Sequence, residues 1–159
     1  MKKAVILRVK NIKERIQEVW YHWITKKEYS WYEDWLIAKL DTVCSLMVRL
    51  RDKHKPCITN WITVCKDWEC DRQCCHAIKR WYYSCRRDLR NMFSGCMACN
   101  KYGGQDHDGM IIAQMIKIHG QEVYDSLREN RSMKKPHLSD MEQLLELREK
   151  EYQQMISQI

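Results

Sequence analysis

The sequence predicts an α+β protein that is mainly helical, with a small metal-binding core between N-terminal and C-terminal helices. Only two Pro and five Gly occur in 159 residues, too few for a sandwich full of turns. Apolar residues recur at helical spacing near both ends, whereas the middle lacks this period and holds most of the nine Cys. We therefore divide the chain into a helical region at 1–55, a core at 56–106 and helices at 107–159.

Two amphipathic helices are expected before the core. Apolar side chains recur every three or four residues over 8–28, as they do on one face of a helix. Ser30 and Glu33 then fit a capping box, in which each side chain accepts an N–H of the first helical turn. A second apolar stripe covers 35–50 and should end before Pro56, because proline disfavours helix in the residue preceding it. We interpret this stripe as core rather than as an exposed face for a partner.

Short strands and then helices are expected in the rest of the chain. Ile58 to Val64 would form a short hairpin and Cys70 to Ile78 a second strand, before Gly103-Gly104 breaks the chain. Helices are expected at 108–118, at 121–128 with Gly120 as the stop between them, and at 139–159 with Ser139 and Glu142 as a capping box.

Cys96 and Cys99 form the firmest local motif. Two thiolates three residues apart on a tight turn can bind one tetrahedral Zn²⁺ at about 2.3 Å. A structural zinc site needs a second pair of ligands, which Cys57 with Cys65 or Cys70 would supply. The alternatives are a redox-active pair, two buried thiols, or a turn held by packing after loss of the metal.

His76 and Asn91 are the other candidates for chemistry. An imidazole that titrates near pH 7 can deprotonate an attacking water, although a lone His among Cys is more often a zinc ligand or a buried residue. Asn91 follows fifteen residues later, a loop length that lets its amide orient the segment bearing His76. Taken alone, such an Asn would be an ordinary turn residue.

Positive charge is concentrated around these motifs. Between Arg49 and Lys101 there are twelve basic and five acidic residues, whereas the segment from Gln121 onward has six basic and eight acidic ones. This placement suits a polyanion such as nucleic acid, although a solvated basic face is the plainer interpretation. The side chains expected to contact DNA are Lys79, Arg80, Arg86, Arg87, Arg90 and Lys101. We expect most of these arginines to be exposed, and at least one of Trp81 and Tyr82 to enter the core.

The N-terminus favours a reducing cytoplasm over a secreted disulfide scaffold. The uninterrupted apolar run before Arg8 has only four residues, which is too short for the core of a signal peptide. No apolar run approaches the roughly 20 residues that span a bilayer, so no membrane partner is expected.

Taken together, these motifs resemble the phage lambda NinG (Rap) family of HNH-type recombination nucleases. The resemblance covers about 40–157 and leaves 1–30 unexplained. Each motif alone would be weak, but the ordered combination is specific. The segments that carry it are Leu40–Asp52, Cys57–Thr59, Gln73–His76, Ser84–Asn91, Cys96–Lys101 and Ile118–Val123.

The resemblance implies a ββα-metal core and endonuclease action on branched DNA such as D-loops and Holliday junctions, in the cytoplasm of a phage-infected bacterium. It makes His76 the general base, Asn91 the residue that orients its loop, and Asn100 a ligand of Mg²⁺ or Mn²⁺. Cys96 and Cys99 would hold structural Zn²⁺. Two active sites would suit a four-way junction, so a homodimer is expected. The alternative is a zinc-stabilised module that binds DNA or a partner but no longer cuts.

The chain departs from the family pattern at three places. Asn60 stands where a zinc-binding Cys is expected. Cys75 replaces a Gly, and its side chain would strain the strand or add a ligand suited to a softer metal than Mg²⁺. Ser94-Gly95 replaces a commoner Pro-Gln.

Overall fold

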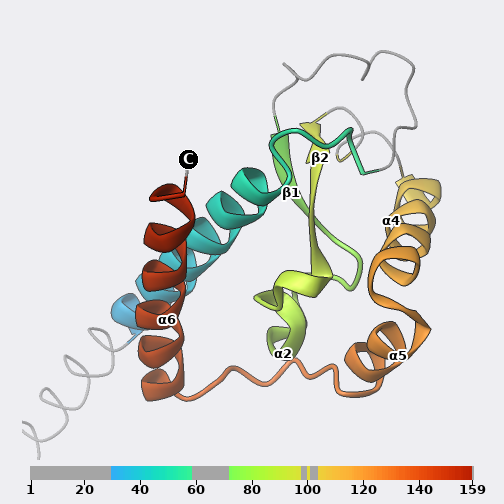
Figure 1. Ribbon diagram of the computed structural model, residues 1–159. Coiled ribbons are helices and arrows are strands. Elements are labelled where there is room, and N and C mark those ends of the chain that lie inside the picture. The colour runs from blue at the N-terminus through green and yellow to red at the C-terminus, as the bar shows by residue number, and fades with distance from the viewer. Residues whose placement is uncertain (1–29, 59–71, 98–99, 101–103, 159) are drawn as a thin grey trace, which may run out of the picture. The chain divides into compact units, whose positions relative to one another are not determined.

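The protein is mainly helical with one small antiparallel sheet, which confirms the α+β class (Figure 1). The structure is a computed structural model that describes residues 30–58, 72–97, 100 and 104–158. Its contacts divide the chain into two units, 1–37 and 38–159. The cysteine-rich core and the helices that follow it belong to the second unit.

The first described helix covers 30–51 and ends before Pro56, as the sequence predicts. The prediction that most of its apolar stripe is core is confirmed, and Trp35 is an exception, 44% exposed and stacked on Tyr32 with 5.7 Å between the ring centroids. The helix expected over 8–28 lies outside the described residues. The stripe is otherwise buried at Leu36, Leu40, Val43, Cys44, Met47 and Val48.

Two strands form the sheet. β1 (Arg72–His76) pairs with β2 (Met92–Cys96) so that His76 lies opposite Met92. Two short helices, α2 (Tyr83–Arg86) and η2 (Leu89–Asn91), connect the strands. The strand expected within 70–78 is therefore present. Of the expected 58–64 hairpin only Ile58 is described, and it lies in a bend.

The outer edge of β2, away from β1, is capped by the chain that follows the first helix. The Asp52 carboxylate accepts the Ser94 N–H at 3.2 Å, and the Ile58 N–H donates to the Ser94 carbonyl at 3.2 Å. Arg51 donates from Nη2 to the Met92 carbonyl at 2.7 Å. These bonds satisfy the polar groups that an open strand edge would leave bare.

Helices pack on both faces of the sheet. On one face, α4 (Gly104–His119) and α5 (Gln121–Glu129) contribute to a core with Cys75 and Phe93. On the other face, Cys44 and Val48 of the first helix pack on Met92. The predicted stop between α4 and α5 is confirmed, since Gly120 has φ 90°, a conformation that residues with a side chain rarely adopt.

The last helix, α6 (Leu138–Ile156), contacts the first through an ion pair between Lys39 and Glu149 at 3.5 Å. The predicted capping box at Ser139 is wrong, because the helix begins one residue earlier and His137 is its N-cap residue. Ser139 instead hydrogen-bonds from its hydroxyl to the His137 ring at 2.9 Å. Ser30 is likewise already helical, so it does not precede its helix as a cap.

Cys75 and Gly95 share one space between the strands. A Cβ added to Gly95 would lie 2.6 Å from the Cys75 sulfur, well inside van der Waals contact. The Cys75 side chain is buried in the core that includes Phe93, on the face of β1 opposite to Cys74 and His76. The absence of a side chain at 95 therefore makes room for the one at 75, which corrects the expectation of a soft ligand beside His76.

We expect Gly95→Ala to lower the free energy of unfolding by about 1–3 kcal/mol, because the new methyl group overpacks against the Cys75 sulfur. Most of this loss should disappear in a Cys75→Ala background, which removes that sulfur. Urea unfolding followed by circular dichroism gives the free energy of unfolding of the wild type, the two single variants and the double variant.

Gly109→Ala is the matched control, because nothing lies within 4 Å of a Cβ built at this position of α4. It should raise stability by roughly 0.5–1 kcal/mol through helix propensity. An equal cost of Gly95→Ala with and without Cys75 would contradict the shared-space interpretation.

Candidate active site

A buried asparagine holds together the loop that follows β1. The Asn91 side chain donates from Nδ2 to the carbonyls of Ile78 and Cys85, each at 3.0 Å. Its Oδ1 accepts the Ile78 N–H at 2.7 Å, and its own carbonyl accepts the Ala77 N–H at 3.0 Å. Asn91 is 0% exposed, so no water competes for these bonds. It therefore orients the segment next to His76, as its spacing in the sequence predicts.

His76 is the last residue of β1 and is half-buried. Its Nε2 lies 3.0 Å from the Arg86 carbonyl, which can only accept a hydrogen bond. Nε2 must therefore carry the proton, and in the neutral ring Nδ1 carries the lone pair. Burial lowers the pKa of His76 below its usual 6.5, and the charge of nearby Arg80 lowers it further, although the bond to Arg86 opposes both. The ring is thus neutral at pH 7 and can accept a proton.

His76 lines a cavity of about 400 Å³ between β1 and the first helix. Two further predicted site residues line the same cavity, the expected metal ligand Asn100 and the expected DNA contact Arg80. Sequence reasoning missed most of the other residues that line the cavity, because they come from distant segments, mainly the first helix and the start of β1. They are Asp41, Thr42, Ser45, Arg49, Arg72, Gln73, Cys74 and Met92.

Arg72 adds a half-buried cation to this wall. Its Nη2 donates to the Lys55 carbonyl at 2.9 Å. Its Nε and Nη1 are buried and have no hydrogen-bond partner in the part of the chain that the structure describes. These two atoms lie on different edges of the guanidinium, so Arg72 contributes positive charge and single hydrogen bonds rather than a parallel pair.

Asp41 lies beside the cavity and binds three of the arginines that follow β1. Arg86 pairs with its carboxylate in a bidentate contact that includes Nε at 3.0 Å. Arg87 and Arg80 approach the same carboxylate at 3.3 Å and 3.8 Å. The side chains of Arg86 and Arg87 are only 12% and 3% exposed. The expectation that most of the arginines are exposed is therefore wrong for these two, because a carboxylate 45 residues away sequesters them.

The other predicted DNA contacts are more accessible. Arg80 and Arg90 are exposed, and Arg90 is paired with Asp88 two residues before it. Lys79 pairs with Asp108 of α4. Lys101 lies outside the described residues. Trp81 is 52% exposed whereas Tyr82 packs against the core, so one of the two aromatic residues is core as expected.

Asn100 offers an oxygen ligand to the cavity. Its Nδ2 donates to Gln73 Oε1 at 2.8 Å, which fixes the amide and leaves Oδ1 as the acceptor. Amide, phosphate and water oxygens are the donors that Mg²⁺ and Mn²⁺ prefer. Burial raises the pKa of the Cys74 thiol to about 12, so in the metal-free protein it is protonated. The donors of this cavity therefore fit a hard divalent ion better than zinc.

Of the predicted zinc ligands, the structure describes Cys57 and Cys96. Both are buried, and the Cys57 sulfur accepts the Cys96 N–H at 3.2 Å, which brings the two backbone segments together. Such N–H to sulfur bonds suit a thiolate ligand. Within the described ranges no three His, Cys, Asp or Glu side chains form a metal-binding group. The other candidates, Cys65, Cys70 and Cys99, and the departure at Asn60 lie outside those ranges.

No family model, curated protein or solved structure matches this chain. None of the helices in the described ranges is long and apolar enough to cross a membrane.

We expect Asn91→Ala to lower the free energy of unfolding by roughly 3 kcal/mol, because it removes three buried hydrogen bonds, including those to the Ile78 N–H and carbonyl. Asn130→Ala is the control, since Asn130 makes a comparable bond to the Ser126 carbonyl at an exposed helix end and should cost less than about 1 kcal/mol. Equal losses in chemical denaturation would contradict the role given to Asn91.

Proposed function

We propose that this protein is a metal-dependent endonuclease of the HNH type that cuts branched DNA during phage recombination. One observation carries the proposal: a neutral, oriented imidazole at His76 lines a cavity whose wall holds Arg49, Arg72 and Arg80. General-base chemistry needs the first feature, and binding of a phosphodiester needs the second. The ordered motifs at 74–100 supply the likeness to this class of nuclease.

The chemistry follows from the proton positions. His76 Nδ1 would take a proton from water, and the oxygen would attack the phosphorus while the bond to the leaving sugar oxygen breaks. Arg72, with Arg49 and Arg80, would supply the positive charge that holds the non-bridging oxygens. Asn100 Oδ1, with phosphate oxygens and water, would hold Mg²⁺ or Mn²⁺, which supplies neutralisation of the charge on the phosphate and leaving group. Cys57, Cys96 and Cys99, with Cys65 or Cys70, would hold structural Zn²⁺ away from the reaction.

The preference for branched DNA comes from the family likeness and from one surface feature. Trp81 is exposed next to the exposed cation Arg80, and such a pair can stack on a base that has lost its partner. Unpaired bases occur where strands exchange. A homodimer acting in the host bacterial cytoplasm would present two active sites to one junction.

A zinc-stabilised DNA-binding module without nuclease activity is the second candidate. The Asp41 carboxylate, the acidic group in the cavity wall, is already bound by Arg86 and Arg87. Among the described residues, a metal would therefore have to rely on Asn100 and the substrate itself. Salt-sensitive binding of junction DNA with no products in Mg²⁺ or Mn²⁺ would favour this candidate.

His76→Ala should reduce the rate of metal-dependent cleavage of a four-way junction by about 10²–10⁴-fold, because the general base is lost. Binding of the same DNA should change little, as measured by mobility shift in Ca²⁺. His54→Ala is the matched control, because His54 is exposed and lies outside the cavity. Cleavage by His76→Ala at the wild-type rate would remove His76 from the mechanism.

The pH dependence of cleavage should report on the same ring. Because the active form is the deprotonated one and burial lowers the pKa of His76, the rate should rise with pH along a limb whose midpoint lies below the usual pKa of 6.5. Arg80→Gln removes a charge that lowers this pKa, so the acidic limb should move to higher pH. Arg90→Gln, outside the cavity wall, should leave the limb in place. An unshifted limb in Arg80→Gln would assign the titration to another group.

A further inference from the structure

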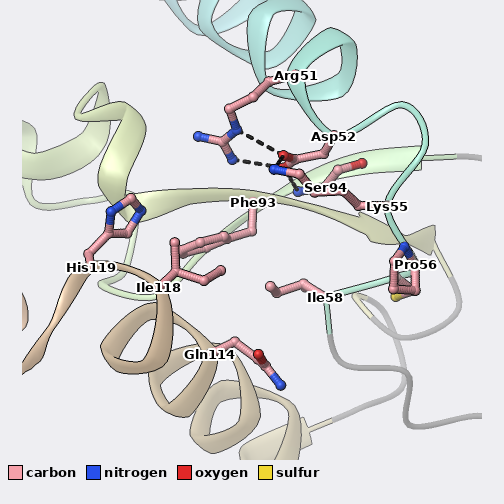
Figure 2. A pocket seen from close by; sticks show the side chains of 11 residues that line it. Arg51, Asp52, Lys55, Pro56, Ile58, Phe93, Ser94, Gln114, Ile118 and His119 are labelled. Carbon is pink, nitrogen blue, oxygen red and sulfur yellow. Dashed lines mark hydrogen bonds and ion pairs between the residues drawn. The ribbon is translucent and has the colours of Figure 1, made fainter.

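A second cavity, of about 410 Å³, lies beside the outer edge of β2, and no residue lines both it and the His76 cavity. Its wall combines the end of the first helix, the chain that caps β2, and the C-terminal half of α4 (Figure 2). A cavity of this size suits a small molecule, since ligand sites commonly have about 300–1,000 Å³.

The lower part of this cavity is apolar. Figure 2 shows Phe93, Ile58 and Ile118 arranged around one hollow. Ile118 is 55% exposed and presents apolar surface at the rim of the cavity. The His119 ring lies 6.1 Å from the Phe93 ring, centroid to centroid. These surfaces would hold a flat, apolar body.

The upper part of the cavity is cationic. Arg51 and Lys55 both bind the one carboxylate of Asp52, at 2.7 Å and 2.9 Å, so one positive charge remains. The Ser94 hydroxyl beside them is buried and has no hydrogen-bond partner within the described residues. A buried hydroxyl in that state is costly, and an anionic oxygen that reaches it would remove the cost.

We propose that this cavity binds a nucleoside monophosphate unit, with the base against Phe93 and Ile118 and the phosphate at Lys55 and the Ser94 hydroxyl. A nucleobase supplies the flat apolar body, and its edge can pair with the Gln114 amide, which both donates and accepts. An aromatic acid would leave Gln114 unpaired, and inorganic phosphate would leave the apolar wall bare. The unit is supplied either by a free nucleotide or by a nucleotide of a DNA strand.

The full chain titrated with dTMP, thymidine and inorganic phosphate, followed by calorimetry, tests this site. Saturable binding of dTMP is expected, with each half bound at least about tenfold more weakly. No saturation by dTMP, or inorganic phosphate bound as tightly as dTMP, would overturn the proposal. Displacement of dTMP by a single-stranded oligonucleotide assigns the ligand to DNA, and retention of dTMP assigns it to a free nucleotide; both results keep the site.

Variants separate this site from the His76 cavity and from folding. Lys55→Gln should weaken dTMP binding by about fivefold, while Lys53→Gln, a lysine in the same turn but outside the wall, should not. Ser94→Ala should weaken binding without lowering the melting temperature, because the hydroxyl it removes is unpaired in the free protein. Arg80→Gln, in the other cavity, should leave dTMP binding unchanged. Wild-type affinity in both Lys55→Gln and Ser94→Ala would rule the assignment out, whatever the outcome for cleavage.

Discussion

The Asn91 amide is the interaction on which the core depends. Asn91 is the last residue of η2, immediately before β2. Its amide bonds to Ile78 and Cys85, which holds the loop after β1 against α2. A two-stranded sheet is marginal in water by itself, so these buried bonds replace the support that further strands would give. The same arrangement positions His76. Asn91 holds α2 through the Cys85 carbonyl, and the next residue of α2, Arg86, offers its carbonyl to the His76 ring. One buried side chain thus sets both the fold and the tautomer of the candidate base.

The outer edge of β2 is the second organising feature. Hydrogen bonds accepted by the Asp52 carboxylate and the Cys57 sulfur, and one donated by the Ile58 N–H, replace a neighbouring strand there. The same stretch of chain brings Cys57 to Cys96, where the zinc ligands are expected, and forms the upper wall of the second cavity. Residues 51–58 therefore contribute to three features at once: the stability of the sheet, the proposed zinc site and the proposed nucleotide site.

Electrostatics divides the basic region into two groups. Arg86 and Arg87 form ion pairs with Asp41, and these ion pairs hold α2 against the first helix. Arg49, Arg72 and Arg80 line the cavity and remain the cations that a phosphodiester would meet. A count of positive charge along the sequence does not distinguish these groups, because burial and partner decide which charge is available to a ligand.

Features that depend on neighbours a few residues apart could be predicted from the sequence. Apolar periodicity predicted α6 and the helix over 30–51, Gly120 predicted the break between α4 and α5, and the spacing of His76 and Asn91 predicted an orienting amide. Features that join distant segments became visible in the tertiary structure. Asp41 reaches Arg86 across 45 residues, and Gly95 makes room for Cys75 across the strand pair. The wall of the second cavity likewise combines residues from three parts of the chain. Local spacing sets backbone conformation, whereas long-range packing decides which charges are buried, which side chains fit and where a cavity remains.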